Sequence, residues 1–120
     1  MDVNDNWWIF IDENVVGYYP VALFSNLINP KTIGWGGVTS IAPNGINPSM
    51  GSGSFPSDGA SSFSNIHFRN QWKIKAAPQS NEYDIIIDRP KCYDLKDDGY
   101  KDDNLGFTFQ FGGLGEQCDN

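Results

Sequence analysis

The sequence predicts an all-β, mainly antiparallel fold with one short helix. Aromatic residues make up 14% of the chain, and glycine, proline, asparagine and serine are abundant. This mixture favours short strands that are joined by turns. Residues that favour helices are scarce, since the chain has three glutamates and no long apolar run of helical period. A chain of 120 residues is at most one domain.

The N-terminal segment predicts a β-hairpin followed by the helix. Trp7 to Ile11 is a strongly apolar run, residues 12–14 are polar, and Val15 to Tyr19 is a second apolar run. Two such runs around a short polar turn are typical of a hairpin. Pro20 to Leu27 predicts the short helix, because the amide that proline lacks at the first helical position would have no partner there. Pro30 excludes a long continuation.

The middle of the chain predicts one strand and then a long loop. Thr32 to Ser40 is predicted as a strand, with glycines where the backbone or a ligand approaches closely. Ala42 to Ala60 contains three prolines and several glycines, which indicate mostly loop. Within this loop, Gly51-Ser52-Gly53 is interpreted as a tight turn rather than an anion-binding nest, because the lysine of a phosphate-binding loop is missing.

The remaining strands are predicted in the C-terminal part of the chain. Phe63, Ile66, Phe68, Trp72 and Ile74 belong to one or two strands, and the broken alternation between the first two indicates a bulge or a bend.

Two further strands follow, at Tyr83 to Ile87 and at Gly106 to Phe111. In the latter, Phe107, Phe109 and Phe111 share one face, because side chains alternate with a period of two along a strand.

The densest acidic stretch, Asp94 to Asn104, is interpreted as a solvated hairpin tip. A calcium loop of the EF-hand type needs oxygen ligands at positions 1, 3, 5 and 12 and glycine at position 6. Counted from Asp94, Asp98 and Gly99 fit, whereas Lys96 and Leu105 do not. Weak calcium binding stays open as the alternative to the hairpin tip, and the sequence predicts no other metal site.

Several short motifs stand in a fixed order along the chain. They are Trp7-Trp8, Val16-Gly17-Tyr18-Tyr19-Pro20, Gly34-Trp35-Gly36-Gly37-Val38, Met50-Gly51-Ser52-Gly53-Ser54-Phe55-Pro56, Cys92-Tyr93-Asp94 and Phe111-Gly112-Gly113-Leu114-Gly115. This ordered set resembles the C-terminal half of the neprosin domain of plants. The resemblance implies a β-sandwich from a family of secreted glutamic endopeptidases that cut next to proline. It makes residues 1–120 a partial domain whose N-terminal half is absent.

The resemblance also assigns a chemical meaning to Val38. A glutamic peptidase needs one carboxyl group to activate water and another to supply a proton. One family glutamate belongs to the N-terminal half, and the other follows the two glycines, where this chain has Val38. Between Glu13 and Glu82 the only carboxylate is Asp58, so a shifted alignment supplies no substitute. We therefore expect no catalytic residue in this chain and no peptidase activity from it alone.

Two functions of different classes follow from these observations. The first is an enzymatically silent relative of the neprosin-like endopeptidases. The alternative is a non-catalytic binding or partner-requiring module that keeps a groove for a proline-containing peptide. A third interpretation has the chain complement a separate N-terminal half.

The residues that we expect to line such a groove are Trp35, Gly36, Gly37 and Tyr18. Aromatic faces suit extended, proline-rich ligands. For each tryptophan taken singly, packing in the core is nevertheless the expected role. His67 lies between apolar neighbours in a predicted strand, so an exposed histidine is expected rather than the base of a serine hydrolase. The Gly-x-Ser-x-Gly sequence that such an enzyme would need is missing.

The two cysteines, Cys92 and Cys118, bracket the last predicted hairpin, and the family resemblance implies a disulfide between them. Such a bridge requires an oxidising compartment. The resemblance implies secretion, although the acidic and polar residues 1–6 do not form a signal peptide.

Charge and hydropathy exclude other classes of function. A formal net charge of −7 argues against a nucleic-acid partner, and we read it as a source of solubility. No stretch approaches the roughly 20 apolar residues of a membrane-spanning helix. We expect no cofactor.

Overall fold

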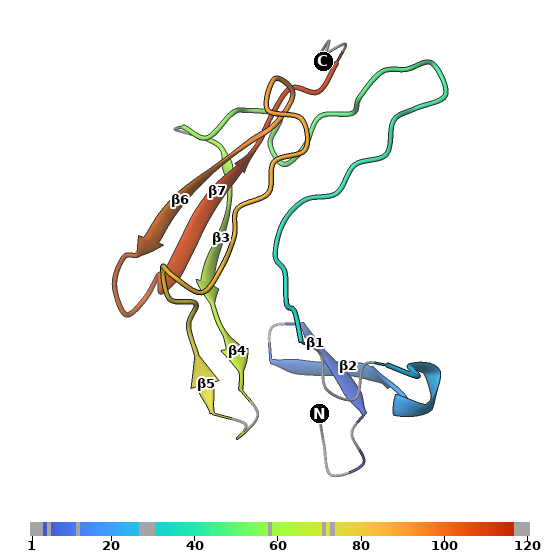
Figure 1. Ribbon diagram of the computed structural model, residues 1–120, viewed down its shortest axis with the longest axis vertical. Coiled ribbons are helices and arrows are strands. Elements are labelled where there is room, and N and C mark those ends of the chain that lie inside the picture. Colours follow the sequence, from blue (N-terminus) through green and yellow to red (C-terminus); the bar gives the residue numbers. More distant parts are fainter. Residues whose placement is uncertain are drawn as a thin grey trace. The chain divides into compact units, whose positions relative to one another are not determined.

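The architecture is almost entirely β (Figure 1). The computed structural model describes residues 4, 6–11, 13–26, 31–57, 59–70, 72 and 74–116. Over these residues the strands pair antiparallel and form open sheets of a sandwich-like kind, which confirms the predicted fold class. The chain divides into two compact units, residues 1–35 and residues 36–120.

The first unit is built on the predicted hairpin. Strand β1 (Trp7–Ile11) pairs with β2 (Asn14–Tyr19), and the register shifts between Ile9 and Phe10. Trp8 lies opposite Tyr18, and their ring centroids are 5.0 Å apart. Cross-strand aromatic pairs of this kind stabilise a two-stranded sheet.

The predicted short helix is a single turn of 3₁₀ helix, η1 (Val21–Leu23). The Leu23 amide donates to the Pro20 carbonyl at 3.0 Å, and Pro20 lies at the N-cap rather than inside the helix. Phe24 already has extended backbone angles, so the helix does not reach the predicted end at Leu27. Leu27 itself lies outside the described residues.

The second unit contains a three-stranded sheet in the order β3-β7-β6 (Figure 1). Its members are β3 (Ser61–Ile66), β6 (Asp94–Tyr100) and β7 (Phe107–Gly112). The register of β3 on β7 shifts between Phe63 and Ile66, which confirms the predicted bulge. The Thr108 hydroxyl donates to the Phe63 carbonyl at 2.6 Å. A side-chain hydrogen bond therefore satisfies this carbonyl oxygen next to the bulge.

Aromatic rings form the core of this sheet. Phe63 lies 5.1 Å from both Phe109 and Phe111, centroid to centroid, and Tyr83 contacts the edge of Phe107 at 5.4 Å. Phe107 and Phe109 are buried. The central strand β7 therefore carries the apolar packing, as the period of two in its phenylalanines predicts.

A small sheet joins β4 (Phe68–Arg69) to β5 (Lys75–Ala76). The predicted strand positions are right for Phe63, Ile66 and Phe68 and wrong for Trp72 and Ile74, which lie outside the strands. Trp72 itself lies in the connecting turn with 70% of its surface exposed. The expectation of a core role is wrong for this tryptophan, because a turn of a two-stranded sheet has no layer to cover it.

Two predicted strands are not strands. Residues 32–40 and 83–87 are extended but pair with no other described strand. A strand needs a ladder partner. Single side-chain hydrogen bonds, from Thr39 to Tyr93 and from Tyr83 to Asp97, connect these segments to the rest of the second unit. The predicted hairpin tip at 94–104 is also too long, because residues 94–100 form β6 and only the residues after Tyr100 make the turn into β7.

Candidate functional site

Two of the short motifs, Met50 to Pro56 and Phe111 to Gly115, meet in the second unit where two backbone segments cross. Residues 47–54 and residues 112–116 pair through isolated bridges, Asn47 with Glu116 and Met50 with Gly113. The Met50 amide donates to the Gly113 carbonyl at 3.0 Å, and the Glu116 amide donates to the Asn47 carbonyl at 2.7 Å. We call these two segments the glycine crossing.

Glycines allow close packing within the glycine crossing and between it and residues 92–93. A Cβ at Gly113 would overlap the Cys92 carbonyl oxygen and lie 2.9 Å from the Tyr93 Cα. A Cβ at Gly115 would overlap the carbonyl oxygens of Asn47 and Pro48. Gly115 also has a φ of 74°, a left-handed conformation that favours glycine. These motif glycines therefore have a packing role.

A polar clamp closes one side of the glycine crossing. Asn47, which is buried, donates through Nδ2 to the Glu116 carbonyl at 2.8 Å and accepts at Oδ1 from Arg89 Nη1 at 3.1 Å. Sequence reasoning missed this clamp, because a single asparagine before a proline is typical of a turn. No local signal connects Asn47 with residues that lie 42 and 69 positions away.

The segment around Val38 is fixed on both sides by the second unit. A Cβ at Gly37 would lie 2.9 Å from Met50 Cγ and 3.2 Å from Phe111 Cε2, so a side chain at residue 37 would have to displace Met50. Thr39 donates through its hydroxyl to Tyr93 Oη at 3.2 Å, and Tyr93 donates to the Pro48 carbonyl at 2.6 Å. Val38, between these anchors, is 96% exposed.

The four groove candidates fall in different parts of the chain. Tyr18 and Trp35 belong to the first unit, whereas Gly36 and Gly37 belong to the second. Tyr18 is half-exposed on β2, Trp35 is half-buried, and Gly36 has open space where a Cβ would stand. The close approach at Gly37 is explained by Met50 and Phe111, and the peptide groove itself stays a prediction.

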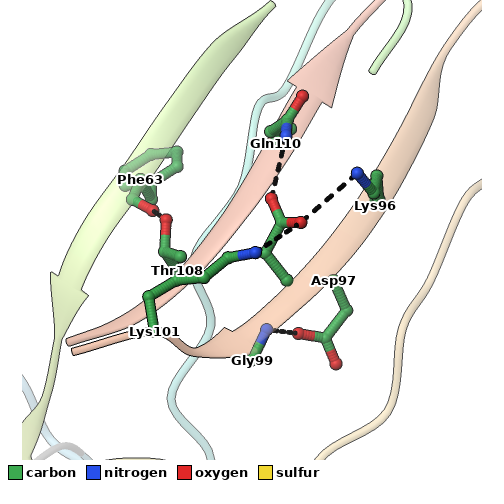
Figure 2. Close-up of polar contacts among 8 residues, drawn as sticks. Phe63, Lys96, Asp97, Gly99, Lys101, Thr108 and Gln110 are labelled. Atoms are coloured by element: carbon green, nitrogen blue, oxygen red, sulfur yellow. Dashed lines mark hydrogen bonds and ion pairs between the residues drawn. The ribbon is translucent and has the colours of Figure 1, made fainter. Parts of the chain in front are cut away.

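The acidic stretch is organised around Asp98 on β6, whose partners Lys96, Lys101 and Gln110 are labelled in Figure 2. Gln110 Nε2 on β7 donates to Asp98 Oδ2 at 2.9 Å, while the Nζ atoms of Lys96 and Lys101 lie 3.4 Å and 3.3 Å from Asp98 Oδ1. The Gln110 hydrogen bond lowers the pKa of Asp98, desolvation opposes this, and the two lysines support it.

Two tyrosines donate hydrogen bonds to other aspartates of the same stretch. Tyr83 donates to Asp97 Oδ2, and Tyr100 donates to Asp103 Oδ1 at 2.7 Å. These hydrogen bonds, supported by desolvation and by repulsion from the carboxylates, raise the pKa of both phenols. Such pairing makes the stretch a structural hairpin rather than a set of open ligands.

Three further expectations concern single residues or sites. His67 is exposed, and its Nδ1 lies 2.7 Å from the Asn65 carbonyl oxygen, as expected of a solvent-facing histidine. Among the described residues, histidine, cysteine, aspartate and glutamate form no group of three that could hold a metal ion. The described part of the chain also has no helix of the length and apolarity that would cross a membrane.

Only one of the two cysteines of the predicted disulfide, Cys92, lies among the described residues. Cys92 is 1% exposed and lies beneath Gly113 in the glycine crossing. Cys118 lies outside the described residues, so the pairing stays a prediction.

Comparison with known proteins agrees with the motif order. The family model for Neprosin matches residues 2–114, which is most of the chain and covers the segment 47–54 and the first residues of the segment 112–116. No solved structure matches the chain. On the extent of this match and the packing of its motifs, the chain belongs to the neprosin family.

Proposed function

We propose that this protein is a neprosin-like β-module that has the peptidase architecture without its acid–base chemistry. The observation that carries the proposal is Val38, which occupies the position that the family resemblance gives to a catalytic glutamate. Valine can neither accept a proton from water nor donate one to a leaving group. General acid–base catalysis contributes about 10²–10⁴-fold to a rate, so its loss leaves little turnover.

The surroundings of position 38 support a loss of chemistry rather than a loss of structure. Gly37 is packed on Met50 and Phe111, and Thr39 is hydrogen bonded to Tyr93. The backbone on both sides of Val38 is therefore fixed, while the side chain at 38 is 96% exposed and free of steric demands. A change from a carboxylate to valine at such a position costs the fold little.

The carboxylates of the acidic stretch are poor substitutes for the missing group. Asp98 accepts from Gln110 and pairs with Lys96 and Lys101, and Asp97 accepts from Tyr83. A catalytic pair needs two carboxyls whose pKa values are driven apart at one reacting bond. These aspartates have partners that serve the β6–β7 hairpin instead.

A peptide-binding module is the second candidate, and the exposed ring of Tyr18 favours it. This ring is about half exposed and lies 5.0 Å from the ring of Trp8, which gives a small aromatic surface on the hairpin. Aromatic surfaces of this kind receive proline-rich segments in several binding domains.

One experiment tests both candidates. The full chain and Val38→Glu are incubated at acidic pH with a proline-containing peptide, next to a neprosin-family peptidase that has glutamate at this position. We expect no cleavage by either form of the chain, because Val38→Glu supplies one carboxyl where two are needed. Binding of the uncleaved peptide to the chain, measured by the change in tryptophan fluorescence, would support the peptide-binding module.

Cleavage by the wild-type chain that survives repurification would refute the silent-module proposal. Cleavage by Val38→Glu alone would show that another residue already supplies the partner carboxyl. Loss of peptide binding in Tyr18→Ala, with the fold retained, would assign the binding surface to the hairpin.

A further inference from the structure

The turn that precedes Asn47 contains an asparagine with unusual chemical surroundings. Asn44-Gly45 is the only Asn-Gly dipeptide in the sequence. Both residues are exposed, and a Cβ at Gly45 would meet no atom within 4 Å. Water and hydroxide therefore reach the Asn44 side chain, while the Gly45 amide is held by one hydrogen bond within the turn.

The turn also places a hydrogen-bond donor on the Asn44 side-chain carbonyl. The Ile46 amide donates to Asn44 Oδ1 at 3.1 Å, so the side-chain oxygen is bonded across the intervening Gly45. Attack on the side-chain carbonyl carbon would put negative charge on Oδ1. A backbone donor already aimed at an oxygen where charge develops stabilises the transition state.

We propose that Asn44 is a site of spontaneous deamidation in the folded protein. The Gly45 nitrogen loses its proton to hydroxide and bonds to the Asn44 side-chain carbonyl carbon. The side-chain nitrogen takes a proton from water and leaves as ammonia, which returns the hydroxide. The five-membered imide that results takes up one water. Opening at the side-chain carbonyl gives aspartate, and opening at the backbone carbonyl gives isoaspartate, in which the chain runs through the former side chain.

Gly45 suits this reaction for two reasons. It has no side chain to hinder the approach of its nitrogen, and its φ of 78° is a left-handed conformation that glycine adopts without strain. Its N–H donates to the Ala42 carbonyl at 2.9 Å, so this hydrogen bond opens when the proton is removed. The rate should therefore rise with hydroxide concentration.

The product would act on the clamp of the glycine crossing. Aspartate or isoaspartate adds one negative charge to a chain whose formal net charge is −7. Isoaspartate also lengthens the backbone inside a turn that is closed by the bond from the Ala42 amide to the Ile46 carbonyl, 3.1 Å long. Asn47, the next residue, holds Glu116 and Arg89. The isoaspartate form should therefore have a looser clamp.

The test is to age the folded chain at mildly alkaline pH and to map each asparagine by peptide mass spectrometry. We expect Asn44 to convert before any other asparagine, to a mixture of aspartate and isoaspartate. Gly45→Ala should slow the conversion by about tenfold or more, because its Cβ hinders the attack and disfavours the left-handed conformation.

A second measurement keeps the proposal testable if Gly45→Ala alters the fold. Wild-type conversion is compared in the folded chain and in urea, where the Ile46 donor is lost. A deamidation rate of Asn44 in the folded chain within about tenfold of its rate in urea supports the proposal. The Ile46 donor then compensates for the hydrogen bond that restrains the Gly45 amide. Stronger protection, or earlier conversion of another asparagine, overturns it.

Asn44→Asp is the matched control for the proposed loosening of the clamp. This variant adds the negative charge of the product without lengthening the backbone. We expect the aged protein to unfold at lower urea concentration than this variant. Equal midpoints for the aged protein and the variant would refute a role for isoaspartate in loosening the clamp.

Discussion

Single glycines decide how closely the backbone segments of this protein can approach. Gly113 lies against the Cys92 carbonyl oxygen and the Tyr93 Cα, and Gly115 lies against the carbonyls of Asn47 and Pro48. Gly36 has no atom within 4 Å of the place where its Cβ would stand. Glycines that look equivalent in the sequence therefore have different physical roles, and the difference can be measured.

Gly113→Ala is expected to destabilise the fold by about 3 kcal/mol, at the upper end for overpacking, because the obstructing atoms are backbone and cannot rotate away. Gly36→Ala, with the same change of side chain, is expected to stay within about 0.5 kcal/mol of wild type. Urea unfolding of both variants measures the difference. Equal stabilities would contradict the close approach at Gly113.

At the scale of elements, the β6–β7 hairpin combines an aromatic core with a charged outer strand. Phe107 and Phe109 of β7 are buried, whereas β6 carries Lys96 and Asp98. A charged outer strand resists pairing with other chains. The Asp98 carboxylate links the two strands, since it accepts from Gln110 on β7.

Asp98 should make this hairpin sensitive to acid. Its folded-state pKa is lowered, first by the Gln110 hydrogen bond, so its contribution to stability is present above the unfolded-state pKa of about 3.9. The contribution is lost as the pH falls from that value through the lower folded-state pKa. Asp98→Asn should therefore be less stable than wild type near neutral pH, and the difference should shrink at about pH 3.

The measurement is the urea midpoint of wild type and Asp98→Asn at both pH values. Asp88→Asn is the matched control, because it removes one carboxylate away from Lys96, Lys101 and Gln110. A difference between wild type and Asp98→Asn that is the same at both pH values would contradict the assignment.

Elements were predicted correctly where local pattern and pairing agree. The β1–β2 hairpin, the Phe63–Ile66 bulge and the strand that ends at Gly112 follow from apolar runs, turn residues and a period of two. Residues 32–40 and 83–87 have similar composition and are not strands. A strand exists only with a ladder partner, and a partner is a property of the tertiary structure.

For the whole molecule, the remaining expectation is the bridge between Cys92 and Cys118. Cys92 is buried beneath Gly113, and Cys118 follows five residues further along the chain. A bridge that closes a loop of roughly 27 residues should stabilise the fold by about 3–4 kcal/mol in the chain-entropy model.

Non-reducing peptide mapping of protein refolded under oxidising conditions should recover the Cys92 and Cys118 peptides joined. Reduction should lower the urea midpoint accordingly. Two free thiols in the oxidised, folded protein would refute the pairing, and an unchanged midpoint after reduction would refute its stabilising role.

Composition and motif order are enough to predict the fold class and the family, because both can be read directly along the chain. The packing of Gly113 and Gly115, the clamp from Asn47 to Glu116 and Arg89, and the exposure of Trp72 become visible only in the folded chain. Each of these depends on which distant segment lies next to a residue, and no local pattern encodes that neighbour.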